Sequence, residues 1–176
     1  MTPLMGPRSV VRVLYILPLR ARKRAHGPLS GKIGGMAGYS GTPLWRKLGI
    51  RPGDTVTLLD APVGFAIDDL PEGVEIRRAA RGRAAVMVAF HTARSTLAHR
   101  FPTLLRALEV DGGLWVAWPK RSSGVPTDIT EDVVREVALP TGMVDNKVCA
   151  IDDTWSGLRL VLRKELRPGR TRAAGS

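Results

Sequence analysis

Acidic side chains are absent from both ends of this chain, although the whole protein carries 27 Lys and Arg against 16 Asp and Glu. Residues 1–35 contain seven basic residues and no acid, and residues 166–176 contain three Arg and no acid. These ends supply ten of the eleven charges in the formal net charge of +11. Residues 36–165 are therefore nearly neutral. Domains that bind nucleic acid usually carry a large excess of basic residues, so we do not expect this core to bind it.

Cysteine and histidine are also scarce. A single Cys149 excludes an internal disulfide, and three His without a Cys/His cluster give no framework for zinc. We therefore predict no metal site and a cytoplasmic location. The apolar run at 10–19 is interrupted by Arg12 and Pro18 and falls short of the roughly 20 residues that cross a bilayer. This excludes a membrane anchor, and the basic residues that follow the run do not fit a signal peptide.

Composition divides the chain into three segments. We expect residues 1–35 to be a basic disordered leader that lies upstream of the true translation start at Met36. Residues 36–165 are expected to form one α/β domain, because about 130 residues is the usual size of a single hydrophobic core. Residues 166–176 are expected to be a basic disordered tail.

Apolar runs alternate with helical patterns along residues 36–165. We predict strands at 55–60, 74–76, 84–90, 114–118, 147–151 and 158–163, and helices at 42–49, 95–108 and 128–138. The runs at 84–90 and 114–118 are apolar at every position, which is typical of parallel strands buried on both faces. The pattern predicts a three-layer, Rossmann-like α/β fold with a mostly parallel sheet of about six strands.

Several stretches of this sequence resemble a family of uncharacterised proteins from high-GC Gram-positive bacteria, a domain of unknown function. They include Leu-Leu-Asp-Ala-Pro at 58–62, Trp-Val-Ala-Trp-Pro-Lys at 115–120 and Ser-Gly-Val-Pro-Thr-Asp at 123–128. Members similar to this chain begin near Met36. This resemblance implies no activity.

The order of elements resembles, more distantly, the fold of S-adenosylmethionine-dependent methyltransferases in a truncated form. Numbering strands as they occur along the chain, this resemblance implies the order 2-1-3-4-6-5, with the last strand antiparallel. It also raises S-adenosylmethionine as a cofactor, held by the loop after the first strand and by the end of the second strand.

Three features depart from such a cofactor site. The loop at 60–65 contains one glycine, Gly64, and its Pro62 lacks a backbone donor. The second strand ends on Arg77 and Arg78, where an acid would accept the ribose hydroxyls. Few residues separate 60 from 84, so a full helix and a further strand have little room. We therefore expect no cofactor, with S-adenosylmethionine as the alternative.

Polar side chains follow three strands of the expected sheet, at the edge where ligands bind in open parallel sheets. This edge is our candidate ligand-binding site, and its catalytic residues, if it has any, are unknown. Its members are Asp60, Gly64, His91, Trp118, Lys120, Ser122 and Ser123. The alternative gives four of them a structural role: Asp60 caps a turn, His91 is a solvated loop residue, Trp118 is core and Lys120 is surface charge.

Three functional hypotheses follow from this edge and from the basic ends. We predict a non-methylating module that binds an unknown small molecule or a protein at the edge. The alternative is a small-molecule enzyme, including a methyltransferase with an atypical cofactor loop. The third hypothesis is non-specific nucleic-acid binding through the Arg-rich ends. Fold analogy alone does not decide among them.

Overall fold

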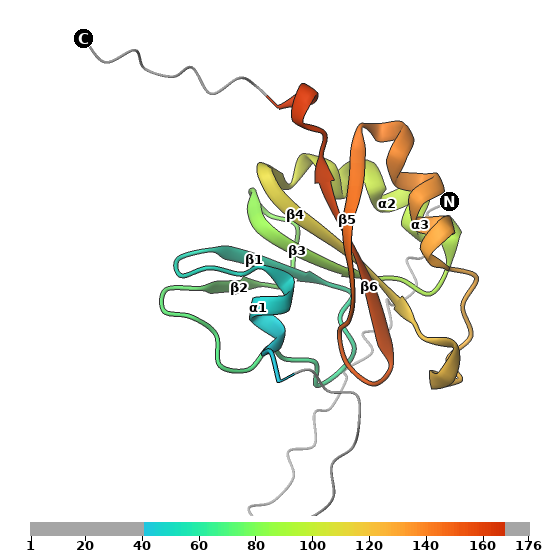
Figure 1. Cartoon of the computed structure of the whole chain (residues 1–176), viewed down its shortest axis with the longest axis horizontal. Coiled ribbons are helices and arrows are strands. Elements are labelled where there is room, and N and C mark those ends of the chain that lie inside the picture. Colours follow the sequence, from blue (N-terminus) through green and yellow to red (C-terminus); the bar gives the residue numbers. More distant parts are fainter. Residues whose placement is uncertain (1–40, 168–176) are drawn as a thin grey trace, which may run out of the picture. The chain divides into compact units, whose positions relative to one another are not determined.

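A computed structural model describes residues 41–167, which form a six-stranded sheet with helices on both faces (Figure 1). The strands are β1 (Thr55–Leu59), β2 (Glu75–Arg77), β3 (Ala84–Phe90), β4 (Leu108–Pro119), β5 (Met143–Ala150) and β6 (Trp155–Leu162). The helices are α1 (Leu44–Leu48), α2 (Arg94–Arg106) and α3 (Glu131–Ala138), with 3-10 turns η1 (Arg121–Ser123), η2 (Leu139–Thr141) and η3 (Lys164–Leu166).

The strand order is β2-β1-β3-β4-β6-β5, as predicted. Strands β2, β1, β3 and β4 pair in parallel, and β6 runs antiparallel to both β4 and β5. The prediction of a mostly parallel α/β sheet with an antiparallel last strand is confirmed.

The predicted leader, residues 1–35, lies outside the described residues, and so does most of the predicted tail. The first two residues of that tail are described: Leu166 ends η3, and the Arg167 Nε donates a hydrogen bond to the Leu162 carbonyl at 3.0 Å. Within residues 41–167, no helix combines the length and the apolar character needed to cross a membrane.

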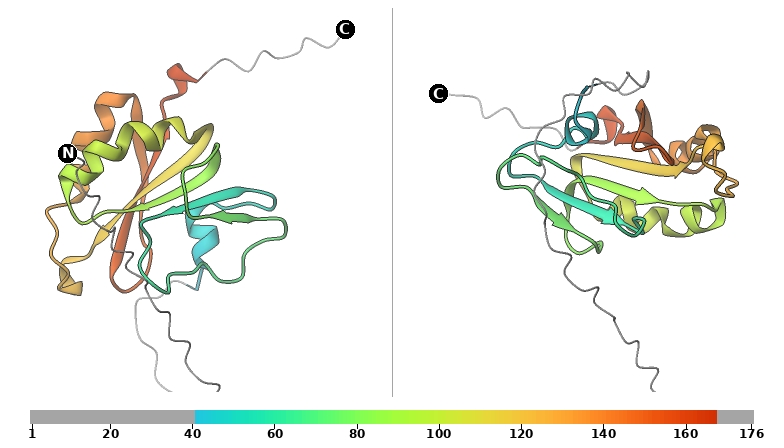
Figure 2. Two further views of the ribbon diagram at one scale, coloured as in Figure 1. Left: turned by 180° about the vertical axis from the view of Figure 1, so that it is seen from behind. Right: turned by 90° about the horizontal axis from the view of Figure 1, so that it is seen from below.

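The two faces of the sheet are covered unequally. Helices α2 and α3 pack on one face, which we name the α2/α3 face, where Leu97, Phe101 and Val134 are almost fully buried against the strands. The opposite face, named the α1 face, is covered by α1 and by the loop of residues 60–74. Helix α1 lies in front of the sheet in Figure 1, and α2 lies in front in the reverse view of Figure 2.

Helix α1 is short but firmly attached. It ends at Gly49, whose φ of 80° lies in the left-handed region that glycine adopts without strain. Pro43 takes the N-cap position, one residue after the predicted start of the helix at 42, and provides no side-chain cap. The fully buried Trp115 donates from Nε1 to the Leu48 carbonyl at 3.0 Å. One indole thus joins the end of α1 to the central strand β4.

No helix forms between β1 and β2. The sequence leaves little room for a full helix there, and the chain crosses the α1 face as a loop containing Pro62 and Pro71. Phe65 from this loop packs edge-on against Phe90, with ring centroids 4.9 Å apart. An aromatic contact therefore occupies the place of a helical layer.

A candidate site at the carboxyl edge of the sheet

The strand order diverges between the ends of β1 and β3, and we name the region outside these two strand ends the crevice. The chain leaves β1 toward β2 on one side and then returns to β3 on the other side, so connections diverge at this point. Open α/β sheets bind ligands outside the carboxyl ends of the strands where such a divergence occurs. Asp60 directly follows β1 and His91 directly follows β3, so both lie at the crevice.

His91 is buried beside charged groups. Its side chain is 5% exposed, and its Nε2 is fully buried without a hydrogen-bond partner among residues 41–167. Burial lowers the pKa of His91, the Asp60 carboxylate opposes this shift, and the Arg100 guanidinium adds to it. The imidazole is therefore neutral at neutral pH and has a ring nitrogen without a partner, as a general base requires.

Asp60 stands at the mouth of the crevice in an uncommon backbone conformation. Its φ of 52° lies in the left-handed region, and its Oδ2 accepts a hydrogen bond from Arg100 of α2. Both side chains are about half exposed, so the ion pair adds little to folding stability. Unusual backbone conformations concentrate at binding and catalytic sites, which makes Asp60 a candidate on grounds of geometry as well as position.

A cleft of about 380 Å³ opens at the end of β4. Its lining includes Trp118, 9% exposed, together with Pro119, Arg121 and residues 127–131. The cleft is connected to the end of β3, because the Thr127 Oγ1 donates to the Thr92 carbonyl at 2.7 Å. The predicted residue Trp118 thus forms an apolar wall one strand away from His91.

Asp128 has a different role from the one expected. The sequence placed it at the start of the helix that ends at Ala138, but its Oδ1 accepts a hydrogen bond of 2.6 Å from the backbone N–H of Arg94, at the start of α2. Thr130 caps α3 instead, its Oγ1 accepting from the Val133 N–H at 3.3 Å. The segment before α3 therefore fixes the start of α2 and the residues next to His91.

Lys120 and the two serines are held by structural contacts. The Lys120 Nζ donates to the Asp152 carbonyl at 2.6 Å, and the Ser123 Oγ donates to the Lys120 carbonyl at 2.7 Å. Ser122 is exposed in η1. Gly64 lies in the loop after β1 with a φ of 81° and open space where a Cβ would point. Of the predicted set, Asp60 and His91 follow two paired strands and interact electrostatically.

Two features of this edge were missed by sequence reasoning. Arg100 reaches Asp60 from α2, and its only sequence signal is its place three residues after the buried Leu97. The second feature is an aromatic row formed by the end of β3, the start of β6 and the loop after β1: the Phe90 ring centroid lies 4.9 Å from that of Phe65 and 5.0 Å from that of Trp155, both edge to face. The only sequence signal for this row was that aromatic residues are scarce in this chain, so an aromatic residue near a strand end is notable.

No family model matches this sequence, and no curated protein matches it. Solved structures do match. A ribosomal protein L11 methylase from Lactobacillus delbrueckii subsp. bulgaricus is 12% identical over 68% of this chain and 75% of that chain, with a TM-score of 0.46. A SAM dependent methyltransferase from Aquifex aeolicus is 13% identical over 66% of this chain and 86% of that chain, with a TM-score of 0.48. The strand order of this chain agrees with the predicted methyltransferase-like order, and these solved structures are similar to it at low identity and at TM-scores below 0.5.

The prediction of a non-methylating module without a cofactor is corrected by these matches. They include magnesium protoporphyrin IX methyltransferase (ChlM) from Synechocystis PCC 6803 with bound SAM, 10% identical over 64% of this chain and 71% of that chain, with a TM-score of 0.45. The error has a physical origin. The prediction rested on the missing glycines and the missing acid, which are local features. The divergence of the strand order between β1 and β3 does not depend on them.

The groups at the crevice fit S-adenosylmethionine in an altered way. Gly64 leaves open space for close approach, and the Asp60 carboxylate is an acceptor at the mouth. Phe90 of the aromatic row is buried, whereas Phe65 and Trp155 are half-buried, and an aromatic face attracts a cation such as a sulfonium. The end of β2 does not offer an acid to the ribose hydroxyls. Its last residue is Arg77, and the Arg77 guanidinium is paired with Glu75 of the same strand at 2.8 Å.

Proposed function

We propose that this chain is an enzyme that acts on a small molecule at the crevice between β1 and β3, with S-adenosylmethionine as its methyl donor. The observation that carries the proposal is His91: a buried, neutral imidazole with an unpartnered Nε2 at the divergence point of the sheet. A buried polar nitrogen without a partner is unfavourable for folding, and in this proposal the bound substrate supplies its partner.

Each group at the crevice has a distinct role in this proposal. Bound S-adenosylmethionine supplies an electrophilic methyl group. His91 accepts the proton that a substrate hydroxyl or amine must lose to become the nucleophile. Asp60 stabilises the imidazolium that results, consistent with its opposing effect on the pKa of His91. Trp118 and the buried Ile129 provide apolar surface for the substrate at the neighbouring cleft.

Further parts of the prediction stand as proposals beside this function. The quoted stretches at 58–62, 115–120 and 123–128 support membership of the uncharacterised high-GC Gram-positive family. We place the protein in the cytoplasm, where a single thiol stays reduced. Burial raises the pKa of the Cys149 thiol, which keeps it protonated and unreactive.

Calorimetric titration of the full chain with S-adenosylmethionine and S-adenosylhomocysteine tests the cofactor. We expect both to bind with dissociation constants in the micromolar range, about −8 kcal/mol. Gly64→Ala should weaken binding, and Gly53→Ala is the matched control, because both glycines have left-handed φ values and open space around a new Cβ. No heat of binding at about 1 mM ligand refutes the proposal.

Release of S-adenosylhomocysteine in the presence of a panel of phenols, amines and thiols tests the catalytic role. His91→Gln should lower the rate by about 10²–10⁴-fold while leaving the affinity for S-adenosylmethionine unchanged. His99→Gln, in the exposed part of α2, is the control. Equal rates for the wild type and His91→Gln would remove His91 from the mechanism.

A further inference from the structure

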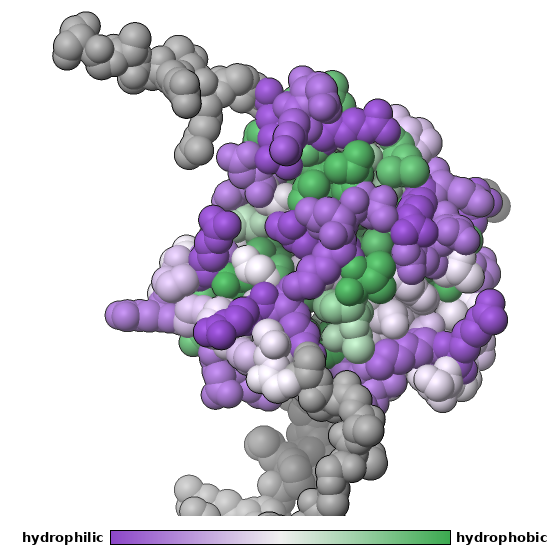
Figure 3. Space-filling view, in the orientation of Figure 1, coloured by the Kyte–Doolittle hydropathy of each residue, from purple (hydrophilic) through white to green (hydrophobic). Residues whose placement is uncertain are grey.

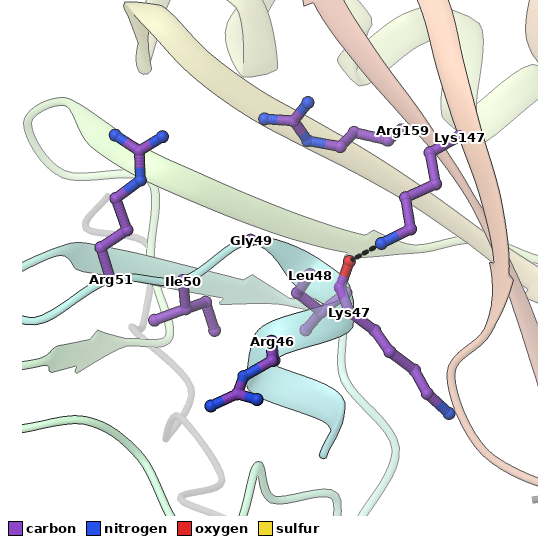
Figure 4. Close-up of a pocket in the computed structure, with 8 residues that line it drawn as sticks. All are labelled: Arg46, Lys47, Leu48, Gly49, Ile50, Arg51, Lys147 and Arg159. Carbon is purple, nitrogen blue, oxygen red and sulfur yellow. Dashed lines mark hydrogen bonds between the residues drawn. The ribbon is translucent and has the colours of Figure 1, made fainter. Parts of the chain in front are cut away.

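A second pocket lies on the α1 face, away from the carboxyl edge. It has a volume of about 310 Å³ and is formed by the end of α1, the start of the next turn and the middle of β5 and β6 (Figure 4). Its lining contains five basic residues and no acid: Arg46, Lys47, Arg51, Lys147 and Arg159. None of these residues belongs to the crevice or to the cleft beside Trp118.

Arg159 forms the inner wall of this pocket. It lies opposite Lys147 in the pairing of β5 with β6, and its guanidinium lies directly over Gly113 of β4. A Cβ at Gly113 would lie 2.7 Å from the Arg159 Nε, so the guanidinium would have to move if any other residue stood there. The side chain is thus seated against the sheet.

The guanidinium of Arg159 has few partners. Its Nε is buried without a hydrogen bond among the described residues. Its Nη1 donates to the Asn146 Oδ1 over a long distance of 3.5 Å. Burial lowers the pKa of Arg159, and the charges of Arg51 and Arg167 lower it further. A positive charge surrounded by like charges and lacking a carboxylate partner is stabilised when an anion joins it.

The surrounding side chains leave the pocket open to an anion. The Lys147 Nζ donates to the Lys47 carbonyl at 2.7 Å, which fixes the ammonium at the pocket wall. In Figure 4 the Lys47 and Arg46 side chains extend away from Arg159. Hydrophilic side chains form a broad band across this face in the space-filling view (Figure 3).

We propose that this pocket binds a small molecule through a terminal phosphate group. Arginine binds phosphate through paired N–H groups, and lysine adds a compact charge. A terminal phosphate is a compact dianion that can enter a pocket and reach Arg159, whereas a phosphodiester within a nucleic-acid strand is flanked on both sides and requires an open groove. The volume is at the lower end of the range for small-molecule sites.

Calorimetric titration of the full chain with inorganic phosphate and with pyrophosphate, at constant ionic strength, tests this site. We expect binding that Arg159→Gln and Arg51→Gln each weaken by about tenfold or more, the effect of losing one charge-assisted hydrogen bond. Arg83→Gln, an exposed residue of the β2–β3 connection, removes the same charge elsewhere and should leave affinity unchanged. Arg51 is exposed, so its variant reports on the site even if Arg159→Gln folds poorly.

Three results would overturn the proposal. The first is no binding of either anion at about 1 mM. The second is an equal loss of affinity in Arg83→Gln, which would show a response to net charge. The third is a single-stranded oligonucleotide that binds more tightly than pyrophosphate and loses affinity in both pocket variants, which would make the pocket a nucleic-acid contact. Each is independent of S-adenosylmethionine binding at the carboxyl edge.

Discussion

The two faces of this sheet are closed by different means. On the α2/α3 face, two helices of 13 and 8 residues cover the strands with aliphatic side chains and Phe101. On the α1 face, a five-residue helix and a loop cover β1, β3 and part of β4. Both faces nevertheless contain fully buried side chains, Leu97 on one and Val88 on the other.

The difference lies in how the buried surface is distributed. Aromatic side chains bury large areas individually, so a few of them can replace a helix. Trp115, Phe65, Phe90 and Trp155 serve in this way on the α1 face. Stability on that face therefore depends on few residues, and the sheet beyond α1 stays open to form the basic pocket.

Replacing one large aromatic on each face gives the sharpest test of this difference. We expect Trp115→Ala and Phe101→Ala each to lower the free energy of unfolding by about 3–5 kcal/mol in urea titrations. Hydrogen exchange should distinguish them. Trp115→Ala removes the donor to the Leu48 carbonyl, so amides of α1 should exchange faster while those of α2 keep their protection. Unchanged protection of α1 would show that the indole is not its anchor.

Removing helix caps tests the other face with a smaller effect. Asp128→Ala should lower the free energy of unfolding by about 1 kcal/mol by leaving the Arg94 N–H without its partner. Thr130→Ala should have a similar effect through α3. Exchange of amides near Arg94 should increase in the first variant only. An increase confined to α3 would restore the role that the sequence predicted for Asp128.

The pH dependence of the free energy of unfolding tests whether the His91 imidazole is buried in its neutral form. The folded pKa of His91 is lowered, whereas the unfolded value is about 6.5. Below that pH the unfolded chain binds more protons, so the free energy of unfolding should fall as pH drops from about 6.5 toward the folded pKa. Urea titrations across this range should show a weaker dependence in His91→Gln and the wild-type dependence in His99→Gln. Identical slopes in all three proteins would contradict the burial of a neutral His91.

The smallest effect is expected at the tip of the loop on the α1 face. Val63 is fully exposed beside Gly64, so Val63→Ser should change the free energy of unfolding by less than about 0.5 kcal/mol. Thermal unfolding measures it. A loss well above that value would show that the loop tip packs against the domain and that the α1 face is more extensively closed than the aromatic row alone implies.

Local patterns were sufficient to predict most of the fold. Uninterrupted apolar runs at 84–90 and 114–118 identified the central strands, and a turn residue such as Gly49 marked the end of a helix. The edge of the sheet that carries Asp60 and His91 followed from strand ends. These signals are local because hydrophobic periodicity and turn chemistry operate over a few residues.

Contacts between distant residues were not predictable in the same way. Arg100 reaches Asp60 across 40 positions, and Asp128 caps a helix that begins 34 residues earlier. The basic pocket brings Arg51 together with Arg159 from opposite ends of the domain. No periodicity records such pairings, because they depend on the angle at which α2 crosses the sheet and on the order in which strands assemble.

The position of β6 has a consequence for folding on the ribosome. This strand is the last to be synthesised, yet it lies between β4 and β5, which do not pair with each other. Until residues 155–162 emerge, β5 has no neighbour and the edge of β4 is exposed, a state that favours pairing with other chains. At roughly 5–20 residues per second the interval is brief. A chain that stops before Trp155 would keep that exposed edge permanently.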